Sequence, residues 1–151
     1  MIPLKDAQSL ILDRTLAIRE VEDIPLHLAN GRTLAIDLIA PFPQPPFTNS
    51  GMDGFALSSE RTESASPESP LRFPVKGYQF AGSHPGNPDR ESAAEIATGA
   101  PLPAGKDAVI TKEEAQTEGG YLIIRRPVSK GENVRWQGED VAAGARLLST
   151  G

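Results

Sequence analysis

The sequence predicts an α+β fold that is mainly β, with one helix near the start followed by short strands. Fourteen glycines and fourteen prolines among 151 residues indicate a turn-rich framework. With only 5% aromatic residues, its core must come from Leu, Ile, Val and Ala. A chain of this length can bury a core as one ordinary domain or as two small ones.

The first part of the chain predicts an amphipathic helix. Apolar residues recur at helical spacing over residues 4–18, with polar and charged residues between them. We expect this stripe to dock either on the rest of the chain or on a second subunit. A helical turn starts at Pro25, and Gly31 supplies its left-handed exit. Residues 33–40 alternate imperfectly and predict a strand.

Short strands separated by loops are predicted for the rest of the chain. Residues 58–70 contain no large apolar residue and predict a mobile surface loop. Residues 71–76 alternate, and Pro74 predicts an edge strand because proline cannot donate to a neighbour. Residues 107–111 and 121–125 predict two paired strands joined through two consecutive glycines.

The charge pattern disfavours nucleic-acid binding, since the net charge is −5 and Arg125-Arg126 is the only pair of adjacent cations. No apolar run approaches the roughly 20 residues of a membrane span, and the first residues lack the features of a signal peptide. We therefore expect a cytoplasmic protein without a membrane partner. The absence of cysteine excludes disulfides, thiolate metal sites and a cysteine nucleophile.

The stretch 42–56 carries the clearest candidate site. Its prolines predict a stiff connection rather than regular structure. It then presents one carboxylate, Asp53, between Gly51 and Gly54, which leave room for a ligand or another backbone. The alternative is a simple Asp-Gly turn between two strands.

Other candidate groups have weaker patterns. Thr98-Gly99 could offer a hydroxyl and a backbone amide to an oxyanion or form a simple turn, whereas the following residues do not match a Walker phosphate loop. Glu139-Asp140 could bind a divalent metal or form a turn. The segment 112–114 is interpreted as a solvated strand end. Neither histidine lies in a ligand-spaced pair, and Ser50 is outside a nucleophile elbow.

Three ordered motifs carry a family resemblance. They are Pro-Pro-Phe-Thr-Asn-Ser-Gly-Met-Asp-Gly-Phe-Ala at 45–56, Thr-Gly-Ala-Pro-Leu-Pro-Ala-Gly-Lys-Asp-Ala-Val at 98–109, and Gly-x-Asn-x-Arg-x-x-Gly-Glu-Asp at 131–140. In this order they resemble the signatures of the MoeA/gephyrin E-domain family, the molybdenum insertases of molybdenum cofactor biosynthesis. The departures are Gly51 for alanine, Phe55 for tyrosine and Lys106 for alanine.

The resemblance implies a reaction and a set of site residues. In the family, molybdate is inserted into the dithiolene of adenylylated molybdopterin with release of AMP. Asp53 and Thr98 match catalytic positions. The positions that the resemblance assigns to substrate binding are Ser50, Gly51, Met52, Gly99, Glu113 and Asp140. The resemblance also implies Mg²⁺ as a cofactor, without identifying its ligands.

The resemblance further implies partners and a domain arrangement. Family members continue beyond the equivalent of Gly151 with a pterin-binding α/β domain, and the site lies between subunits of a homodimer. We therefore expect half a site, completed by the missing C-terminal domain or by a partner subunit. The expected domains are an elongated one over 1–44 and 135–151, and an inserted irregular β-rich one over 45–134. The alternative is a non-catalytic binding or dimerisation module; a degenerate, functionless product is a third possibility.

Overall fold

A computed structural model describes residues 2–16, 18–87 and 89–151. It divides into two compact units, Met1–Leu38 with Leu148–Gly151, and Ile39–Leu147. Among the described residues there is one α-helix and ten short strands, which confirms the mainly β, α+β fold class. The predicted division at residues 44/45 and 134/135 stays a prediction.

In the first unit, the helix α1 spans Leu4–Arg14 and is shorter than the predicted 4–18. Thr15 ends it in an extended conformation, and its hydroxyl donates to the Ile11 carbonyl at 2.7 Å. Ala17 lies outside the described residues. No residue of α1 is buried, so the partner of its apolar stripe stays a prediction.

The helical turn after Pro25 is confirmed as the 3-10 helix η1 (Leu26–Leu28), followed by Gly31 at φ +77°. The predicted strand 33–40 is reduced to β1, Leu38–Ile39, which pairs with β10, Arg146–Leu148. Before β1 the backbone is held by the last residues instead of by a ladder. The Thr150 hydroxyl donates to the Leu34 carbonyl at 3.0 Å.

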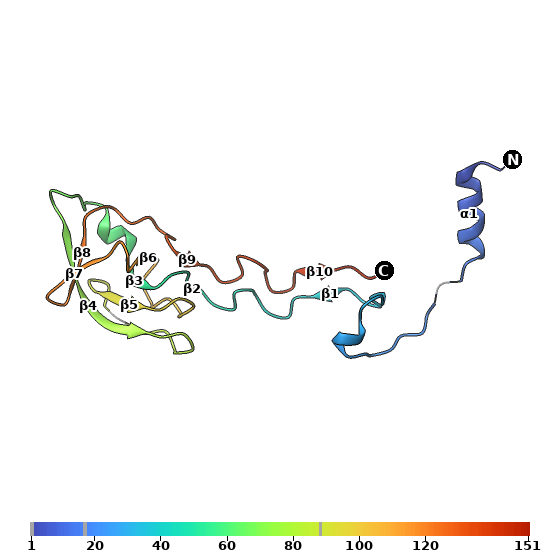
Figure 1. Cartoon of the computed structure of the whole chain (residues 1–151), viewed down its shortest axis with the longest axis horizontal. Coiled ribbons are helices and arrows are strands. Elements are labelled where there is room, and N and C mark those ends of the chain that lie inside the picture. Colours follow the sequence, from blue (N-terminus) through green and yellow to red (C-terminus); the bar gives the residue numbers. More distant parts are fainter. Residues whose placement is uncertain (1, 17, 88) are drawn as a thin grey trace. The chain divides into compact units, whose positions relative to one another are not determined.

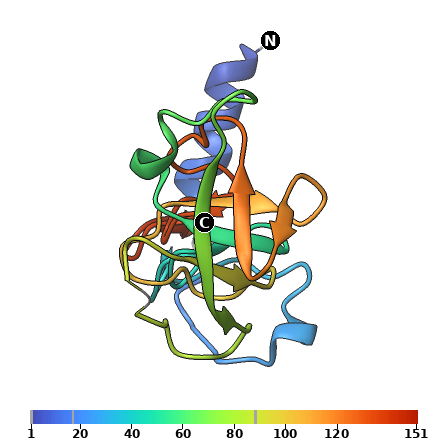
Figure 2. The same ribbon diagram turned by 90° about the vertical axis from the view of Figure 1, so that its left-hand side faces the viewer.

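The second unit is built on a mixed six-stranded sheet in the order β6-β3-β5-β4-β8-β7 (Figure 1). Its strands are β3 (Gly54–Leu57), β4 (Leu71–Gln79), β5 (Ala93–Ile96), β6 (Ala108–Thr111), β7 (Gln116–Glu118) and β8 (Tyr121–Ile124). The β4–β5 pair is parallel and all other neighbours are antiparallel. Figure 2 shows the long β4 (green) beside β8 (orange).

Two strand predictions are wrong. The strand containing Pro74 is not at an edge, because β4 pairs with β8 over Leu71–Pro74 and with β5 from Val75 onward. Proline is tolerated at position 74 because the pairing with β8 ends there and the pairing with β5 begins only at Val75. The strands at 107–111 and 121–125 do not pair with each other either. β6 pairs with β3, and the Gly119-Gly120 turn instead joins β8 to the polar strand β7.

Apolar residues gather on both faces of this sheet, as the period of two along a strand requires. On one face Phe55 and Ile110 lie opposite each other in a cluster with residues of β4 and β8. On the other face Ala56 and Val109 are opposite each other and pack with Ile96. Strand β3, which lies between β6 and β5, is therefore buried along its whole length.

The predicted mobile loop 58–70 is wrong for its first half. Residues Ser59–Thr62 form the 3-10 helix η2. The fully buried Thr62 hydroxyl donates to the Ser59 carbonyl and accepts from the Val128 amide at 2.8 Å. Asp107 accepts from Ser59, at 2.7 Å from the amide and 2.9 Å from the hydroxyl. Small polar residues can be buried here because the protein supplies their hydrogen-bond partners.

The segments that lead into and out of the sheet run side by side (Figure 1). The Ala40 amide donates to the Ala145 carbonyl, and the Gln44 amide donates to the Val141 carbonyl, both at 2.8 Å. Further along, β2 (Asn49–Ser50) pairs with β9 (Val134–Arg135). The proline-rich part of 42–56 has almost no regular structure, as predicted, but the stretch also contains β2 and most of β3.

Candidate functional site

Asp53 lies in a turn between β2 and β3, two strands that pair with other partners and not with each other. Because β3 and β5 are antiparallel with Gly54 opposite Ile96, the residue before Gly54 meets those that follow Ile96. The backbone amide and the hydroxyl of Thr98 both donate to Oδ1 of Asp53, at 2.6 and 2.8 Å. The structure thus brings together the two residues predicted to be catalytic.

The Asp53 carboxylate is stabilised in its charged form. Hydrogen bonds from the Thr98 amide and hydroxyl, followed by the positive charge of Lys112, lower the pKa of Asp53 below its ordinary value. Both hydrogen bonds end on Oδ1. Among the described residues Oδ2 has no protein partner, so one oxygen of an ionised, exposed carboxylate is available to a ligand.

Lys112 is a residue of this site that sequence reasoning missed. Its backbone amide donates to the Asp53 carbonyl at 3.0 Å, and its ammonium lies 2.7 Å from Oε1 of Glu95. The hydrogen bond to Glu95 raises the pKa of Lys112, with a smaller contribution from Asp53. The signal was the alternation of β6: Lys112 is two positions after the buried Ile110 and falls on the same face.

Four predicted substrate-binding residues surround the Asp53 turn. Ser50 is buried, with its hydroxyl donating to the Met52 carbonyl at 2.6 Å and its own carbonyl accepting from the Gly99 amide at 2.8 Å. Gly51 donates to the Asn133 carbonyl at 2.8 Å. These contacts brace the turn. Met52 and Gly99 are exposed beside it, and substrate binding by all four residues stays a prediction.

The two glycines that flank Asp53 have different spatial requirements. A Cβ on Gly54 would lie 2.0 Å from the Ile110 carbonyl oxygen, so no side chain fits where β3 approaches β6. A Cβ on Gly51 would lie 3.3 Å from the Asn133 carbonyl oxygen. The alanine of the family signature therefore needs only a small shift at position 51.

Glu113 and Asp140 take no part in the Asp53–Thr98 hydrogen bonds. Glu113 is exposed in the turn after β6. Asp140 forms an ion pair with Arg135, whose guanidinium also lies 2.8 Å from Glu139. In the described part of the chain neither carboxylate forms a hydrogen bond or ion pair with Asp53 or Thr98, and their roles stay predictions.

The Lys106 departure has a structural explanation. Lys106 is buried, and its ammonium donates to the carbonyl oxygens of Asp89, at 2.8 Å, and of Ser92. Burial lowers the pKa of Lys106. The Lys106 side chain therefore stabilises the segment before β5, and it makes no hydrogen bond to the Asp53 carboxylate.

No group of three or more His, Asp or Glu side chains within 2–16, 18–87 and 89–151 is arranged to hold a metal ion. Asp53 Oδ2 alone fits a cation that takes a single protein carboxylate and completes its shell with water and substrate oxygens, as Mg²⁺ does. Over the same residues no helix is long and apolar enough to cross a membrane.

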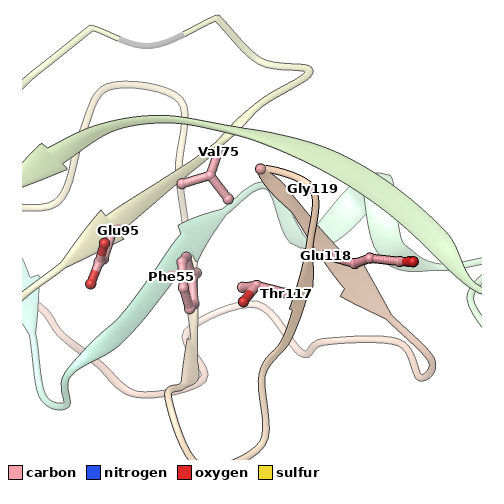
Figure 3. A pocket seen from close by; sticks show the side chains of 7 residues that line it. Phe55, Val75, Glu95, Thr117, Glu118 and Gly119 are labelled. Carbon is pink, nitrogen blue, oxygen red and sulfur yellow. The ribbon is translucent and has the colours of Figure 1, made fainter.

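A shallow pocket of about 250 Å³ lies beside Phe55 and Glu95 (Figure 3). Phe55 lies between Glu95 and Thr117, with Val75 above and the Gly119-Gly120 turn at the rim. Phe55 also belongs to the apolar cluster of the sheet. The position that carries tyrosine in the family signature is therefore a core position that borders a pocket.

Comparison with known proteins gives consistent matches. A family described as "MoeA N-terminal region (domain I and II)" matches residues 2–151. The molybdopterin molybdenumtransferase of Synechococcus elongatus is 41% identical over 134 residues, covering 87% of this chain and 33% of that protein. The molybdopterin molybdenumtransferase 2 of Mycobacterium tuberculosis is 36% identical over 154 residues, covering 100% of this chain and 37% of that protein.

Solved structures agree. The molybdopterin biosynthesis moeA protein of Pyrococcus horikoshii superposes with a TM-score of 0.90 at 34% identity, covering 100% of this chain and 40% of that one. The chain thus spans about a third of the length of the curated relatives that it matches.

Proposed function

Because the chain belongs to the family of MoeA N-terminal regions, we propose that it supplies the Asp53–Thr98 part of the active site of a molybdenum insertase. The relatives are named molybdopterin molybdenumtransferases, and the proposed reaction is the insertion of molybdate into adenylylated molybdopterin with release of AMP. The observation that carries the proposal is the pair of Thr98 hydrogen bonds on one oxygen of Asp53.

The geometry supports a positioning and electrostatic role for Asp53. With Oδ1 held by two donors of Thr98, the orientation of the carboxylate is restrained and Oδ2 receives neither of these hydrogen bonds. Oδ2 can accept a hydrogen bond from water or bind a cation. We propose Asp53 as a ligand of Mg²⁺, whose charge offsets that of the anionic substrates when it is bound. The exposed residues Met52 and Gly99 lie beside it, and their backbone groups hydrogen-bond to Ser50.

The nucleotide and pterin must be bound elsewhere, because this chain corresponds to about a third of its relatives. We propose that a C-terminal pterin-binding domain, or a partner subunit that carries it, completes the site in a cytoplasmic homodimer. The predicted domains, 1–44 with 135–151 and 45–134, belong to the same proposal. The 151-residue chain by itself is then expected to be inactive.

The test is Asp53→Asn in the complete protein, assayed for molybdate insertion and AMP release. We expect insertion to be abolished and folding to be retained, because Asp53 is exposed and asparagine has the same shape. Asp13→Asn, at an exposed position of α1, is the matched control. Near-normal insertion by Asp53→Asn would refute the proposal. Binding of adenylylated molybdopterin by the unsubstituted protein without AMP release would favour a binding module instead.

A further inference from the structure

Three charged side chains meet at one end of the sheet because of its register. Phe55 lies opposite both Glu95 on β5 and Ile110 on β6. Directly opposed residues share a face, and residues two apart on a strand return to it. Continuing the alternation past the strand ends places Asp53 before Phe55 and Lys112 after Ile110, on the face that carries Glu95.

The contacts confirm this placement. The Lys112 amide donates to the Asp53 carbonyl at 3.0 Å, which extends the β3–β6 ladder by one position. The Lys112 ammonium lies 2.7 Å from Glu95, and Tyr78 on β4 lies opposite Glu95 on the other side. Glu95 also lines the pocket beside Phe55 (Figure 3).

The Lys112 ammonium retains capacity for a ligand. An ammonium group has three donors, and Glu95 takes one of them. The Lys112 side chain is 45% exposed, so the other donors can reach solvent. No ion pair joins Lys112 to Asp53 among the described residues, and both Thr98 hydrogen bonds end on Oδ1, so Oδ2 of Asp53 stays open.

We propose that Lys112 is an anion-binding residue of this site and that it donates to an oxygen of a doubly charged tetrahedral oxyanion held beside Asp53 and Thr98. The inference rests on the proposed function, because it names the group that attracts the anionic substrate. A carboxylate alone repels such an anion, and a neighbouring ammonium offsets that repulsion. The ligand is either free molybdate or a phosphate group, since both have this chemistry.

The experiment titrates inorganic molybdate, and separately inorganic phosphate, into the 151-residue chain by calorimetry. Lys112→Met keeps the length of the side chain and removes its charge. We expect it to bind the anion about tenfold more weakly, the size of one lost charge-assisted hydrogen bond. Lys112→Arg should remain within about threefold of the unsubstituted chain because it keeps the charge. Lys130→Met, at an exposed lysine in another loop, is the matched control and should change nothing.

The outcomes separate the ligand sources and the two proposals. Binding of molybdate alone assigns the site to the metal oxyanion, and binding of phosphate as well assigns it to phosphate-bearing substrates too. Equal affinity of Lys112→Met and the unsubstituted chain overturns the inference, as does the failure of the unsubstituted chain to bind either anion. An unchanged thermal unfolding midpoint in Lys112→Met shows that the loss is not structural. Normal insertion by Asp53→Asn would refute the proposed role of Asp53, whereas anion binding that depends on Lys112 would still support the role of Lys112. The two proposals can therefore be refuted separately.

Discussion

Asp53 and Asp107 each accept hydrogen bonds from the backbone amide and the hydroxyl of a single Ser or Thr, yet their surroundings differ. Asp107 divides its oxygens between the two donors of Ser59, so Oδ1 and Oδ2 are both occupied. Asp53 accepts both donors of Thr98 on Oδ1. Ser59 is buried, whereas Thr98 and Asp53 are exposed.

The difference separates structure from function. A carboxylate whose oxygens are both used by the protein fastens two segments, here η2 and the start of β6. A carboxylate that is oriented through one oxygen leaves the other for a ligand. An aspartate bonded to a hydroxyl residue thus serves folding at one end of β6 and is proposed to serve chemistry at the other.

Among the variants considered, Gly54→Ala should cause the largest loss of stability. It disturbs the turn that carries Asp53 and leaves the Asp107–Ser59 contact unchanged. The added Cβ would lie 2.0 Å from the Ile110 carbonyl, which no rotamer can relieve. We expect a loss of about 3 kcal/mol or more in the free energy of unfolding, measured by urea denaturation. Gly51→Ala is the control in the same turn, where the Cβ contact is 3.3 Å. Equal losses in both variants would contradict this account.

Asp107→Ala and Asp53→Ala compare the two carboxylates directly. Removing Asp107 leaves the buried amide and hydroxyl of Ser59 without an acceptor, so we expect a loss of about 1–3 kcal/mol. Asp53→Ala should change stability much less, because water can replace the carboxylate at an exposed site. Denaturation curves of both variants check the order, and a larger loss in Asp53→Ala would reverse the assignment of roles.

Thr98→Val tests how far the hydroxyl hydrogen bond lowers the pKa of Asp53. It removes the hydroxyl bond and keeps the amide bond, so the pKa of Asp53 should rise toward the ordinary 3.8 without reaching it. Because the folded-state pKa is lowered, the contribution of Asp53 to stability is present above pH 3.8 and is lost as the pH falls through the lower folded-state value. The stability difference between Thr98→Val and the unsubstituted chain should narrow in that acidic range.

Carbon-13 NMR of the Asp53 carboxyl measures this pKa, with Thr117→Val as the control at an exposed threonine of β7. An unchanged Asp53 pKa in Thr98→Val would mean that the hydroxyl bond does not persist in solution.

Lys112→Met should have the smallest effect of the series. It should raise the pKa of Asp53 less than Thr98→Val does, because the Lys112 side chain acts on the Asp53 carboxylate only through its charge, at a site exposed to solvent. The same carboxyl resonance gives the value, and 1 M salt should remove most of the difference by screening. A larger rise than in Thr98→Val would show that Lys112 contacts Asp53 directly in solution.

Sequence patterns located four of the strands in the described part of the chain, β1, β4, β6 and β8, but not the partners of β6 and β8. Residues 108–111 and 121–124 were recognisable because they are nearly continuous apolar segments. Their pairing was wrong because β7, the true partner of β8 across the glycine turn, is polar and fully exposed. Such a strand has no hydrophobic signal. The loop at 58–70 was misjudged because Ser59 and Thr62 are small polar residues whose burial depends on distant partners.

The candidate site was predicted residue by residue, through the family motifs, but not as an arrangement. The motifs identified Asp53 and Thr98, whereas their hydrogen bonds depend on the antiparallel register of β3 and β5, which the sequence does not display. Lys112 was interpreted as a solvated strand end. Its ion pair with Glu95 crosses between β6 and β5, two strands separated by β3, and no local pattern reveals such a contact.

The chain segments that lead into and out of the six-stranded sheet are hydrogen-bonded to each other, so the two ends of this region lie close together. Since the backbone amide of Ala40 donates directly to the carbonyl of Ala145 at 2.8 Å, everything between them begins and ends at one hydrogen-bonded pair. A host protein needs only an exposed hairpin to accept residues 41–144 without stretching. We expect that inserting residues 41–144 into another protein would transfer the Asp53–Thr98 pair together with the sheet that positions it.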